Sequence, residues 1–360
     1  MAEKVLMKGN EAVAEAAIRA GCRLYFAYPI TPQSELIEYM SRQLPKVNGT
    51  FLQAESEVAA INMVYGAAGC GKRVMTSSSS PGISLKMEGV SYIAGANLPA
   101  VIVNVQRGGP GLGDIQPAQG DYFQATKGGG HGDYHTIVMA PSTVQEFADM
   151  AQLSFDLADQ YRIPVMILSD GMLGQMMEPV EFKKTMSDEE ISTQDHKHHD
   201  WCMRPNEDGE KHHHHEVNSL EIDPNVLEKH VISLSEKYKL IEEKETRHEE
   251  YCIKEDNEIL CVAFGTASRI VKSAVDQLNA EGHKVGLIRP ITVWPYPYNA
   301  VRKAVTDKIK KVVVFELNLG QMLEDVKIAV NGKADVEFLG KVGGIIFTPE
   351  EVKAKIEQYL

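Results

Sequence analysis

The stretch PAVIVNVQRGGPGLG, residues 99–113, does most to decide the fold. Residues 99–105 are apolar at every position except Asn104, whereas a strand with one solvated face alternates apolar and polar side chains. The run therefore predicts a parallel strand that is buried on both faces. Arg107 and a glycine-rich loop follow it, and glycines at this density let backbone approach a ligand or another chain closely.

Strand and helix patterns alternate on both sides of this strand. We expect further strands at residues 24–28, 50–53, 73–76, 137–140 and 163–169, and helices that begin near residues 33, 56, 83 and 143. The alternation predicts a doubly wound α/β domain, with helices on both faces of a parallel sheet. Ligands of such sheets bind at the carboxyl ends of the strands.

The remainder of the chain divides into a polar segment and a second α/β region. Residues 182–255 carry nine of the twelve histidines, and we expect a linker there with one long helix over 224–250. From residue 256 the alternation resumes, with strands expected at 259–264, 284–288, 311–316, 326–330 and 336–339. The predicted organisation is a domain over 1–181, a linker over 182–255 and a smaller domain over 256–360.

Composition narrows the classes of function. The formal net charge of −13 disfavours a nucleic-acid partner, because an acidic surface repels phosphate backbones. The five cysteines are scattered without a C-x-x-C pair, which argues against a disulfide framework and against an iron–sulfur cluster held by this chain alone. The charged N-terminus and the lack of a run of about 20 apolar residues lead us to expect a cytoplasmic protein without a membrane partner.

Two short motifs place polar groups at expected strand ends. In YPITP, residues 28–32, two prolines stiffen the loop that carries Thr31, whose hydroxyl either meets a ligand or caps the next helix. In QAESEVAAI, residues 53–61, Glu57 begins a helix, where a carboxylate is commonly stabilised by the helix dipole. A catalytic role for Glu57 requires instead that it point into a cleft.

Two further motifs follow later strands. The loop TSSSSPG, residues 76–82, either caps a helix or lines a polar ligand with its hydroxyls and N–H groups. Arg107 offers a fork of donors that matches a carboxylate in two hydrogen bonds. Residues 127–133, KGGGHGD, repeat the glycine-rich pattern and suggest a mobile active-site or interface loop. The histidines at 196, 198, 199 and 212–215 lack a partner carboxylate at a defining spacing, so no metal site is expected from them.

Taken together, these motifs resemble one family. YPITP (28–32), AESEVAAINMVYGAA (54–68), TSSSSPGISLKMEG (76–89) and NVQRGGPGLG (104–113) occur in the order seen in the α subunit of 2-oxoacid:ferredoxin oxidoreductases. Residues 264–297 are similar to the transketolase C-terminal-like domain of that subunit. The run from 107 to 135 resembles the branched-chain (2-oxoisovalerate, or 3-methyl-2-oxobutanoate) type more than the 2-oxoglutarate type.

The resemblance implies a fold and a set of site residues. Residues 1–181 would be a thiamine-diphosphate-fold pyrimidine-binding domain, and residues 256–360 a smaller domain II. Glu57 matches the Glu that hydrogen-bonds N1′ of the aminopyrimidine, Thr31 a residue near the substrate oxygens, and Arg107 one that neutralises the carboxylate of the 2-oxoacid. The cofactor contacts implied are Glu57, Pro29, Ile30, Ser80, Pro81 and Gly82.

The resemblance also implies an activity and partners. The expected reaction is oxidative decarboxylation of a 2-oxoacid to acyl-CoA and CO₂, with coenzyme A as co-substrate and ferredoxin reduced. A Gly-Asp-Gly motif for the diphosphate and Mg²⁺ is missing, as are cysteines for a cluster. A β subunit with the diphosphate-binding domain would therefore complete the site, with Mg²⁺ and an iron–sulfur cluster on partner subunits. Further γ and ferredoxin-like δ subunits are possible partners, in a dimer of the hetero-oligomer.

Three alternatives stay open at this point. The substrate could be 2-oxoglutarate within the same family, or the chain could belong to a thiamine-dependent 2-oxoacid enzyme that uses no ferredoxin. The third alternative is a non-catalytic assembly or regulatory scaffold, which would need none of Glu57, Thr31 and Arg107.

Overall fold

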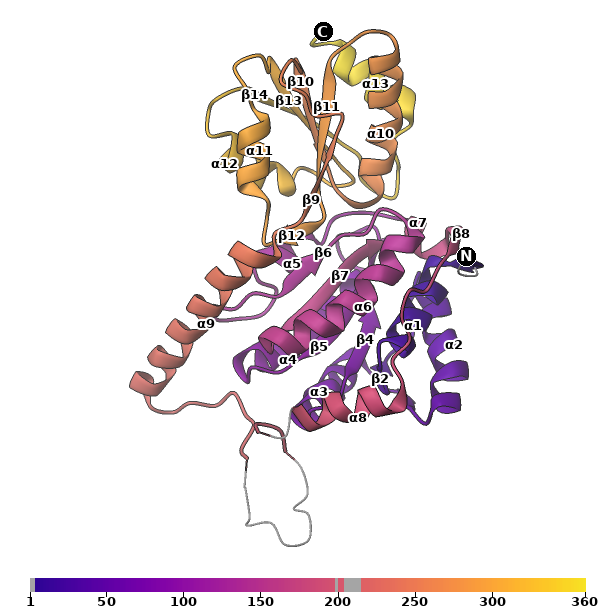
Figure 1. Ribbon diagram of the computed structural model, residues 1–360, viewed down its shortest axis with the longest axis vertical. Coiled ribbons are helices and arrows are strands. Elements are labelled where there is room, and N and C mark those ends of the chain that lie inside the picture. Colours follow the sequence, from indigo (N-terminus) through magenta and orange to yellow (C-terminus); the bar gives the residue numbers. More distant parts are fainter. Residues whose placement is uncertain (1–3, 198–199, 204–214) are drawn as a thin grey trace, which may run out of the picture.

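The computed structural model describes residues 4–197, 200–203 and 215–360. Two α/β units follow one another along the chain, joined by the helix α9 (Pro224–Glu245) that runs beside the first unit (Figure 1). The expectation of an α/β fold is confirmed.

The first unit contains β1 (Val5–Lys8), α1 (Gly9–Arg19), β2 (Leu24–Ala27), α2 (Ser34–Gln43), a 3₁₀ turn (Leu44–Val47), β3 (Thr50–Gln53), α3 (Glu57–Gly69), β4 (Val74–Ser78), α4 (Ser80–Gly95), β5 (Ala100–Gln106), α5 (Tyr122–Thr126), β6 (Ile137–Met139), α6 (Val144–Tyr161), β7 (Pro164–Asp170), α7 (Gly171–Gln175) and β8 (Met177–Val180). Its main sheet has the order β12-β6-β7-β5-β4-β2-β3. All pairs are parallel except the one between β6 and β12 (Thr292–Trp294), a strand contributed by the second unit.

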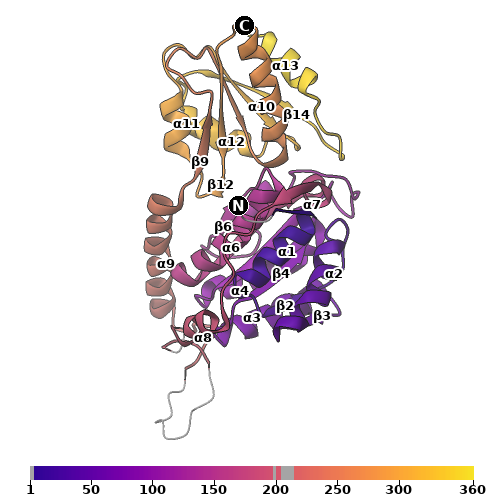
Figure 2. The ribbon, with the colours of Figure 1, turned by 45° about the vertical axis from the view of Figure 1, so that its right-hand side comes forward.

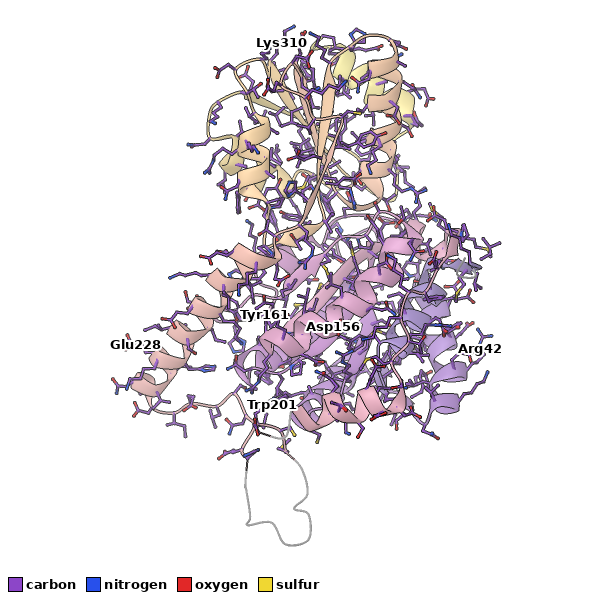
Figure 3. The ribbon with its side chains drawn as sticks, viewed as in Figure 1. Arg42, Asp156, Tyr161, Trp201, Glu228 and Lys310 are labelled. Atoms are coloured by element: carbon purple, nitrogen blue, oxygen red, sulfur yellow. The ribbon has the colours of Figure 1, made fainter. Side chains whose placement is uncertain are left out.

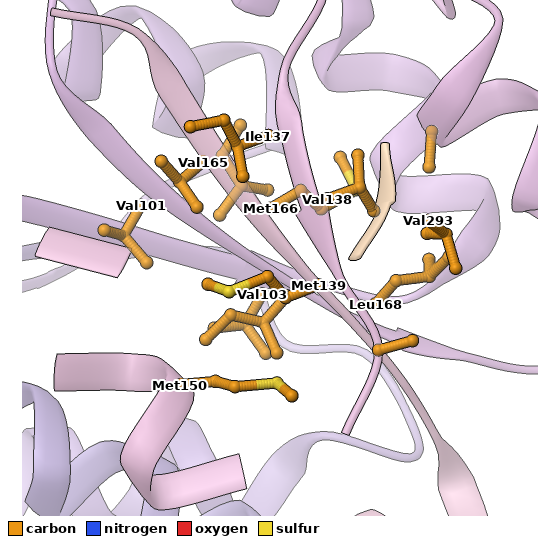
Figure 4. Close-up of a cluster of buried hydrophobic side chains, with 14 of the residues drawn as sticks. Val101, Val103, Ile137, Val138, Met139, Met150, Val165, Met166, Leu168 and Val293 are labelled. Atoms are coloured by element: carbon orange, nitrogen blue, oxygen red, sulfur yellow. The ribbon is translucent and has the colours of Figure 1, made fainter. Parts of the chain in front are cut away.

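Both faces of this sheet are covered. Right-handed crossovers place α3 and α4 on one face and α1, α2 and α6 on the other; α3 packs on α4, and α1 packs on both α2 and α6. Every residue of β4, β5 and β7 is buried, as the apolar run at 99–105 predicts. Figure 4 shows part of the buried core around these strands, which includes Val101 and Val103 of β5, Val165 of β7, Met150 of α6 and Val293 of β12.

The second unit contains β9 (His248–Tyr251), β10 (Ile259–Ala263), α10 (Gly265–Ala280), β11 (Val285–Pro290), β12, α11 (Tyr298–Ala304), β13 (Lys311–Glu316), α12 (Met322–Val330), β14 (Asp335–Gly340) and α13 (Pro349–Glu357). Its sheet has the order β14-β13-β10-β11-β9, with only β9 antiparallel. The strand predicted at residues 326–330 was wrong, because this run is the end of α12. Its buried residues, at 322, 325, 326, 329 and 330, have the spacing of one helix face.

The segment between the units also differs from its prediction. It contains a helix that was not expected, α8 (Asp188–Lys197), and the helix expected over 224–250 ends at Glu245. There the Glu245 carboxylate accepts a hydrogen bond from Tyr161 Oη at 2.6 Å and pairs with Arg247 at 2.7 Å. Residues 248–251 then pair with β11, so a long-range contact overrides the local helical preference of His-Glu-Glu-Tyr. In Figure 3, Glu228 marks the far end of α9 and Tyr161 its contact with α6.

The two units are joined by strand pairing and by hydrogen bonds as well as by the linker. Besides the pairing of β12 with β6, Gln119 of the first unit donates to Phe264 O at 2.9 Å and accepts from Leu317 N at 3.0 Å. Asp325 of α12 is fully buried and accepts from Tyr122 and Lys127 of the first unit, both at 2.6 Å. Figure 2 shows the second unit stacked on the end of the first where β12 lies. In the part of the chain described, no helix has the length and apolar character to cross a membrane.

Candidate active site

Glu57 is the first residue of α3 and is buried. Ser56 caps the N-terminus of this helix, because its Oγ accepts a hydrogen bond from Ala59 N at 3.2 Å. An acidic residue that only complemented the helix dipole would face water, yet the Glu57 side chain is 6% exposed. The Glu57 side chain is therefore buried rather than solvated, and its catalytic role stays a prediction.

The first turn of α4 leaves room for this carboxylate. A Cβ at Gly82 would lie 2.6 Å from Glu57 Oε1 and 2.1 Å from Ser78 Oγ, so any other residue there would collide with both. Gly82 thus allows the start of α3 and the end of β4 to lie close together at the carboxyl edge of the sheet. The absent side chain is what permits Glu57 to reach over α4.

A row of hydroxyls is buried near Glu57. The side chains of Thr76, Ser77, Ser78 and Ser79 are fully buried at the end of β4. Ser77 Oγ lies 2.5 Å from Tyr25 Oη and 2.5 Å from Gln33 Oε1, which fixes one end of the row. The hydroxyls of Ser78 and Ser79 have no protein partner, although buried hydroxyls are ordinarily satisfied. Unsatisfied hydroxyls beside a buried carboxylate fit a site that completes its hydrogen bonds with a polar ligand.

Ser80 links α4 to the strand β5. Its φ of 22° lies at the margin of the left-handed region, which is costly for a residue with a Cβ. Its Oγ donates to Asp121 Oδ2 at 2.6 Å and accepts from Arg107 N at 3.0 Å. Asn104 Nδ2 donates to the same Asp121 oxygen at 2.9 Å. Burial raises the pKa of Asp121, while these two hydrogen bonds act in the opposite direction.

Arg107 is buried and bridges two loops. Its guanidinium donates to Thr31 O and to Leu112 O, each at 2.9 Å, and its Nε has no protein partner. The structure therefore brings Arg107 and Thr31 together, but through the backbone carbonyl of Thr31; the Thr31 side chain is exposed. Pro29 is likewise exposed and Ile30 half-buried, so this loop faces outward.

The predicted residues thus form two groups on one edge of the sheet. Glu57 and Gly82 make the first, Ser80, Arg107 and Thr31 the second, and Pro81 joins them within the first turn of α4. Sequence reasoning missed Asp121, which ties Ser80 to Asn104. The signal that could have found this cluster was Asn104 itself, a polar residue in an otherwise apolar buried strand.

A cavity of about 940 Å³ lies elsewhere, between α5, α9, β12 and α11. None of the predicted site residues lines it. In the part of the chain described, no group of three or more His, Cys, Asp or Glu side chains could hold a metal ion. The histidines at 198, 199 and 212–214 lie outside the described residues, and His215 Nδ1 is 3.0 Å from Cys202 O.

Comparison with known proteins places the chain in a family. Residues 15–245 match the model of the pyruvate flavodoxin/ferredoxin oxidoreductase thiamine-diphosphate-binding domain, and residues 257–352 match pyruvate:ferredoxin oxidoreductase core domain II. The chain belongs to the pyruvate flavodoxin/ferredoxin oxidoreductase family. The resemblance drawn from the motifs is confirmed.

Curated relatives cover nearly the whole chain. The ketoisovalerate oxidoreductase subunit VorB of Methanothermobacter thermautotrophicus is 48% identical over 353 residues, which are 98% of this chain and 97% of that protein. The 2-oxoglutarate synthase subunit KorA of Methanocaldococcus jannaschii is 36% identical over 368 residues, with 97% and 98% covered.

A solved structure gives the same fold. The 2-oxoglutarate:ferredoxin oxidoreductase from Magnetococcus marinus, solved with 2-oxoglutarate, coenzyme A and succinyl-CoA bound, has a TM-score of 0.84 and 28% identity. The match covers 99% of this chain and 65% of that one, so this chain spans about two thirds of its length. A split-gene transketolase with a TM-score of 0.58 and 12% identity shares the fold.

Proposed function

We propose that this chain is the α-type subunit of an enzyme that oxidatively decarboxylates 3-methyl-2-oxobutanoate to an acyl-CoA and CO₂, reducing ferredoxin. The observation that carries the proposal is the full-length identity of 48% to a ketoisovalerate oxidoreductase subunit, against 36% to a 2-oxoglutarate synthase subunit. The site described above supports it, because the residues that the family resemblance assigns to this chemistry share one edge of the sheet.

Glu57 and the residues around Gly82 would hold the aminopyrimidine of thiamine diphosphate. When bound, this cofactor supplies a carbanion that attacks the 2-oxo carbon and an electron sink for the pair released with CO₂. Glu57 is suited to share a proton with N1′ of the pyrimidine, since its carboxyl is buried and Oε1 lies against Gly82. The unsatisfied hydroxyls of Ser78 and Ser79 would complete the polar lining.

Arg107 would bind the carboxylate of the 2-oxoacid. Two of its nitrogens are held by backbone carbonyls, which fixes the plane of the guanidinium, and Nε remains without a protein partner. Because the same guanidinium holds Thr31 O, Arg107 would also position the loop of Pro29, Ile30 and Thr31 beside the substrate. A guanidinium whose orientation is already fixed favours recognition of a carboxylate.

Partner chains would cover this edge of the sheet. Several large apolar side chains around it are exposed, namely Tyr28, Leu52, Val58, Leu85, Leu112 and Ile115. A concentration of exposed apolar surface marks an interaction site. We propose that a β subunit binds here and supplies the diphosphate and Mg²⁺ site, with the iron–sulfur cluster also on partner subunits. The γ and δ chains, the dimer of the hetero-oligomer, the use of coenzyme A by this chain and the cytoplasmic location remain part of the same proposal.

The test is anaerobic reduction of methyl viologen by the complex co-purified with this chain. The assay contains thiamine diphosphate, Mg²⁺ and coenzyme A, and compares 3-methyl-2-oxobutanoate, 2-oxoglutarate and pyruvate. We expect coenzyme A-dependent reduction that is fastest with 3-methyl-2-oxobutanoate. A preference for 2-oxoglutarate would favour the alternative that the KorA and Magnetococcus matches represent. No reduction from a complex that carries cofactor and clusters, but turnover with NAD, would reassign the chain to a ferredoxin-independent enzyme.

A further inference from the structure

Asp121 directly precedes α5, in a stretch of the first unit that the second unit holds on both sides. Before it, Gln119 N donates to Leu317 O at 2.9 Å, and Leu317 N donates to Gln119 Oε1 at 3.0 Å. After it, Phe123 N donates to Gln321 Oε1 at 2.7 Å. The second unit therefore fixes the backbone that carries Asp121.

The side chain of Asp121 bonds the first unit instead. Its Oδ2 accepts from Ser80 Oγ at 2.6 Å and from Asn104 Nδ2 at 2.9 Å. Ser80 and Asn104 also bond each other, because Ser80 N donates to Asn104 Oδ1 at 3.2 Å. The carboxylate thus closes a ring of hydrogen bonds that joins the strand β5 to the start of α4.

Ser80 connects this ring to the loop of Arg107. Its Oγ accepts the backbone N–H of Arg107 at 3.0 Å and donates to Asp121 Oδ2. A hydroxyl has a single hydrogen, and the Asp121 carboxylate is the closer acceptor for it, since Arg107 O lies 3.3 Å from Oγ. The carboxylate therefore orients the hydroxyl so that a lone pair faces the N–H of Arg107.

Two parts of the candidate site depend on this link. The backbone of Arg107 determines where its guanidinium begins. Gly82, which lies against Glu57 Oε1, follows Ser80 by two residues in the first turn of α4. Ser80 has a φ of 22°, and a residue with a Cβ keeps such a conformation only where its surroundings hold it. The ring of hydrogen bonds supplies that hold.

We propose that Asp121 is a positioning residue for the candidate site: through Ser80 it holds the backbone of Arg107, so that the guanidinium meets the carboxylate of the 2-oxoacid in a fixed orientation. This inference rests on the proposed function, in which Arg107 binds that carboxylate. Asp121 acts here as a hydrogen-bond acceptor and not through its charge. An amide of the same shape should therefore replace it.

The first measurement needs no cofactor and compares Asp121→Ala with Asp121→Asn in the complex co-purified with this chain. Hydrogen–deuterium exchange is followed at the backbone amides of Ser80 and Arg107, whose acceptors are Asn104 Oδ1 and Ser80 Oγ. Asp121→Ala removes the acceptor that holds both partners, so we expect exchange at the two amides to rise by about tenfold. Asp121→Asn keeps an acceptor oxygen and should exchange as the wild type does.

The second measurement separates positioning from packing by steady-state kinetics. If the Arg107 guanidinium is misplaced, KM for the 2-oxoacid should rise by about tenfold in Asp121→Ala, while KM for coenzyme A changes by less than about twofold. A residue with only a structural role would lower the amount of active complex, and therefore the apparent kcat, without changing KM. Asp121→Asn should restore the wild-type KM.

Glu245→Ala is the matched control. Glu245 is also a buried carboxylate that joins different elements, since it accepts from Tyr161 of α6 and pairs with Arg247, outside the candidate site. We expect this variant to keep the wild-type KM and the wild-type exchange at Arg107. Equal changes in Glu245→Ala and Asp121→Ala would contradict the inference, because general loosening of the chain would then explain both.

A double-mutant cycle with Arg107→Ala tests the path from Asp121 to the substrate. If Asp121 acts through Arg107, Asp121→Ala should raise KM for the 2-oxoacid no further in the Arg107→Ala background. A rise by the same factor in that background overturns the inference. So does wild-type exchange or wild-type KM in Asp121→Ala, or an Asp121→Asn variant that behaves like Asp121→Ala. Each of these results leaves the proposed function intact.

The proposed function fails by a different result, namely a wild-type complex that turns over no 2-oxoacid. Amide exchange would still decide in that case whether Asp121 holds Arg107. If Asp121→Ala does not assemble, Ser80→Gly takes its place in the same measurements. Glycine adopts a φ of 22° without strain, and the loss of the hydroxyl cuts the same link to Arg107.

Discussion

Glu57→Gln keeps the shape of the side chain but removes the atom that can share a proton with N1′. The amide fits beside Gly82 as the carboxylate does, so assembly and melting temperature should stay near the wild-type values. Turnover should fall by about 100-fold to 10,000-fold, the usual contribution of a positioned proton-transfer group. Viologen reduction measures the loss, and near-normal turnover in a folded complex would remove Glu57 from the chemistry.

Arg107→Ala removes the fork of donors at the second group of the site. We expect kcat/KM for the 2-oxoacid to fall by about 10-fold to 150-fold, the equivalent of a charge-assisted hydrogen bond of about 1.5–3 kcal/mol. Arg42→Ala, on the exposed surface of α2, is the control (Figure 3). Unchanged KM and kcat in Arg107→Ala would place the substrate carboxylate elsewhere.

The sequence indicated which single residues lie together at the candidate site, while their roles stay predictions. Glu57, Gly82 and Arg107 lie in motifs whose order is characteristic of the family, and the structure places all three at one sheet edge. Asp121 was not predicted, because its partner lies on another element: Asp121 accepts a hydrogen bond from Ser80, 41 positions away. The hydroxyl role assigned to Thr31 remains a prediction, since the structure shows its carbonyl in contact with Arg107.

At the scale of elements, the junction of α3 and α4 depends on a glycine. Gly82→Ala would set a methyl group against Glu57 Oε1 and Ser78 Oγ, so one of the two side chains must move. We expect a loss of cofactor affinity of about tenfold or more, as for about 1.4 kcal/mol, with the fold retained. Gly66→Ala is the matched control, because Gly66 lies in α3 with open space around it and an alanine there favours the helix. Cofactor titration followed by fluorescence compares the two; equal affinities would show that Glu57 can move without loss.

The elements that the sequence mispredicted depend on distant contacts. The buried strand β5 was predicted because a two-sided apolar run has few other solutions. The strand β9 was missed because His-Glu-Glu-Tyr has no strand pattern of its own and becomes a strand only by pairing with β11. The end of α12 was mistaken for a strand because its β-branched residues favour strands locally, whereas its burial follows a helix.

At the scale of the whole molecule, Asp325 fastens the two units. It is fully buried and accepts from Tyr122, Lys127 and Tyr298, so its removal leaves three donors without their acceptor. We expect Asp325→Ala to destabilise the chain by about 1–3 kcal/mol, as for a buried Tyr122 hydroxyl left without its acceptor, because Lys127 is 42% exposed and can be solvated. Asp335→Ala, which removes an exposed partner of Lys311, should have little effect. Thermal denaturation of both variants measures the difference. Equal melting temperatures would show that Asp325 does not stabilise the contact between the two units.

The shared strand β12 makes the first unit incomplete without the second. Residues 292–294 come from beyond the long helix, yet they occupy the outermost position of the seven-stranded sheet, next to β6. A fragment that stopped at residue 255 would leave the outer edge of β6 unpaired, along a strand whose three residues are all buried in the whole chain and whose other edge pairs with β7. An exposed apolar strand edge can pair with other molecules, so such a fragment should aggregate. In the whole chain, β12 covers this edge.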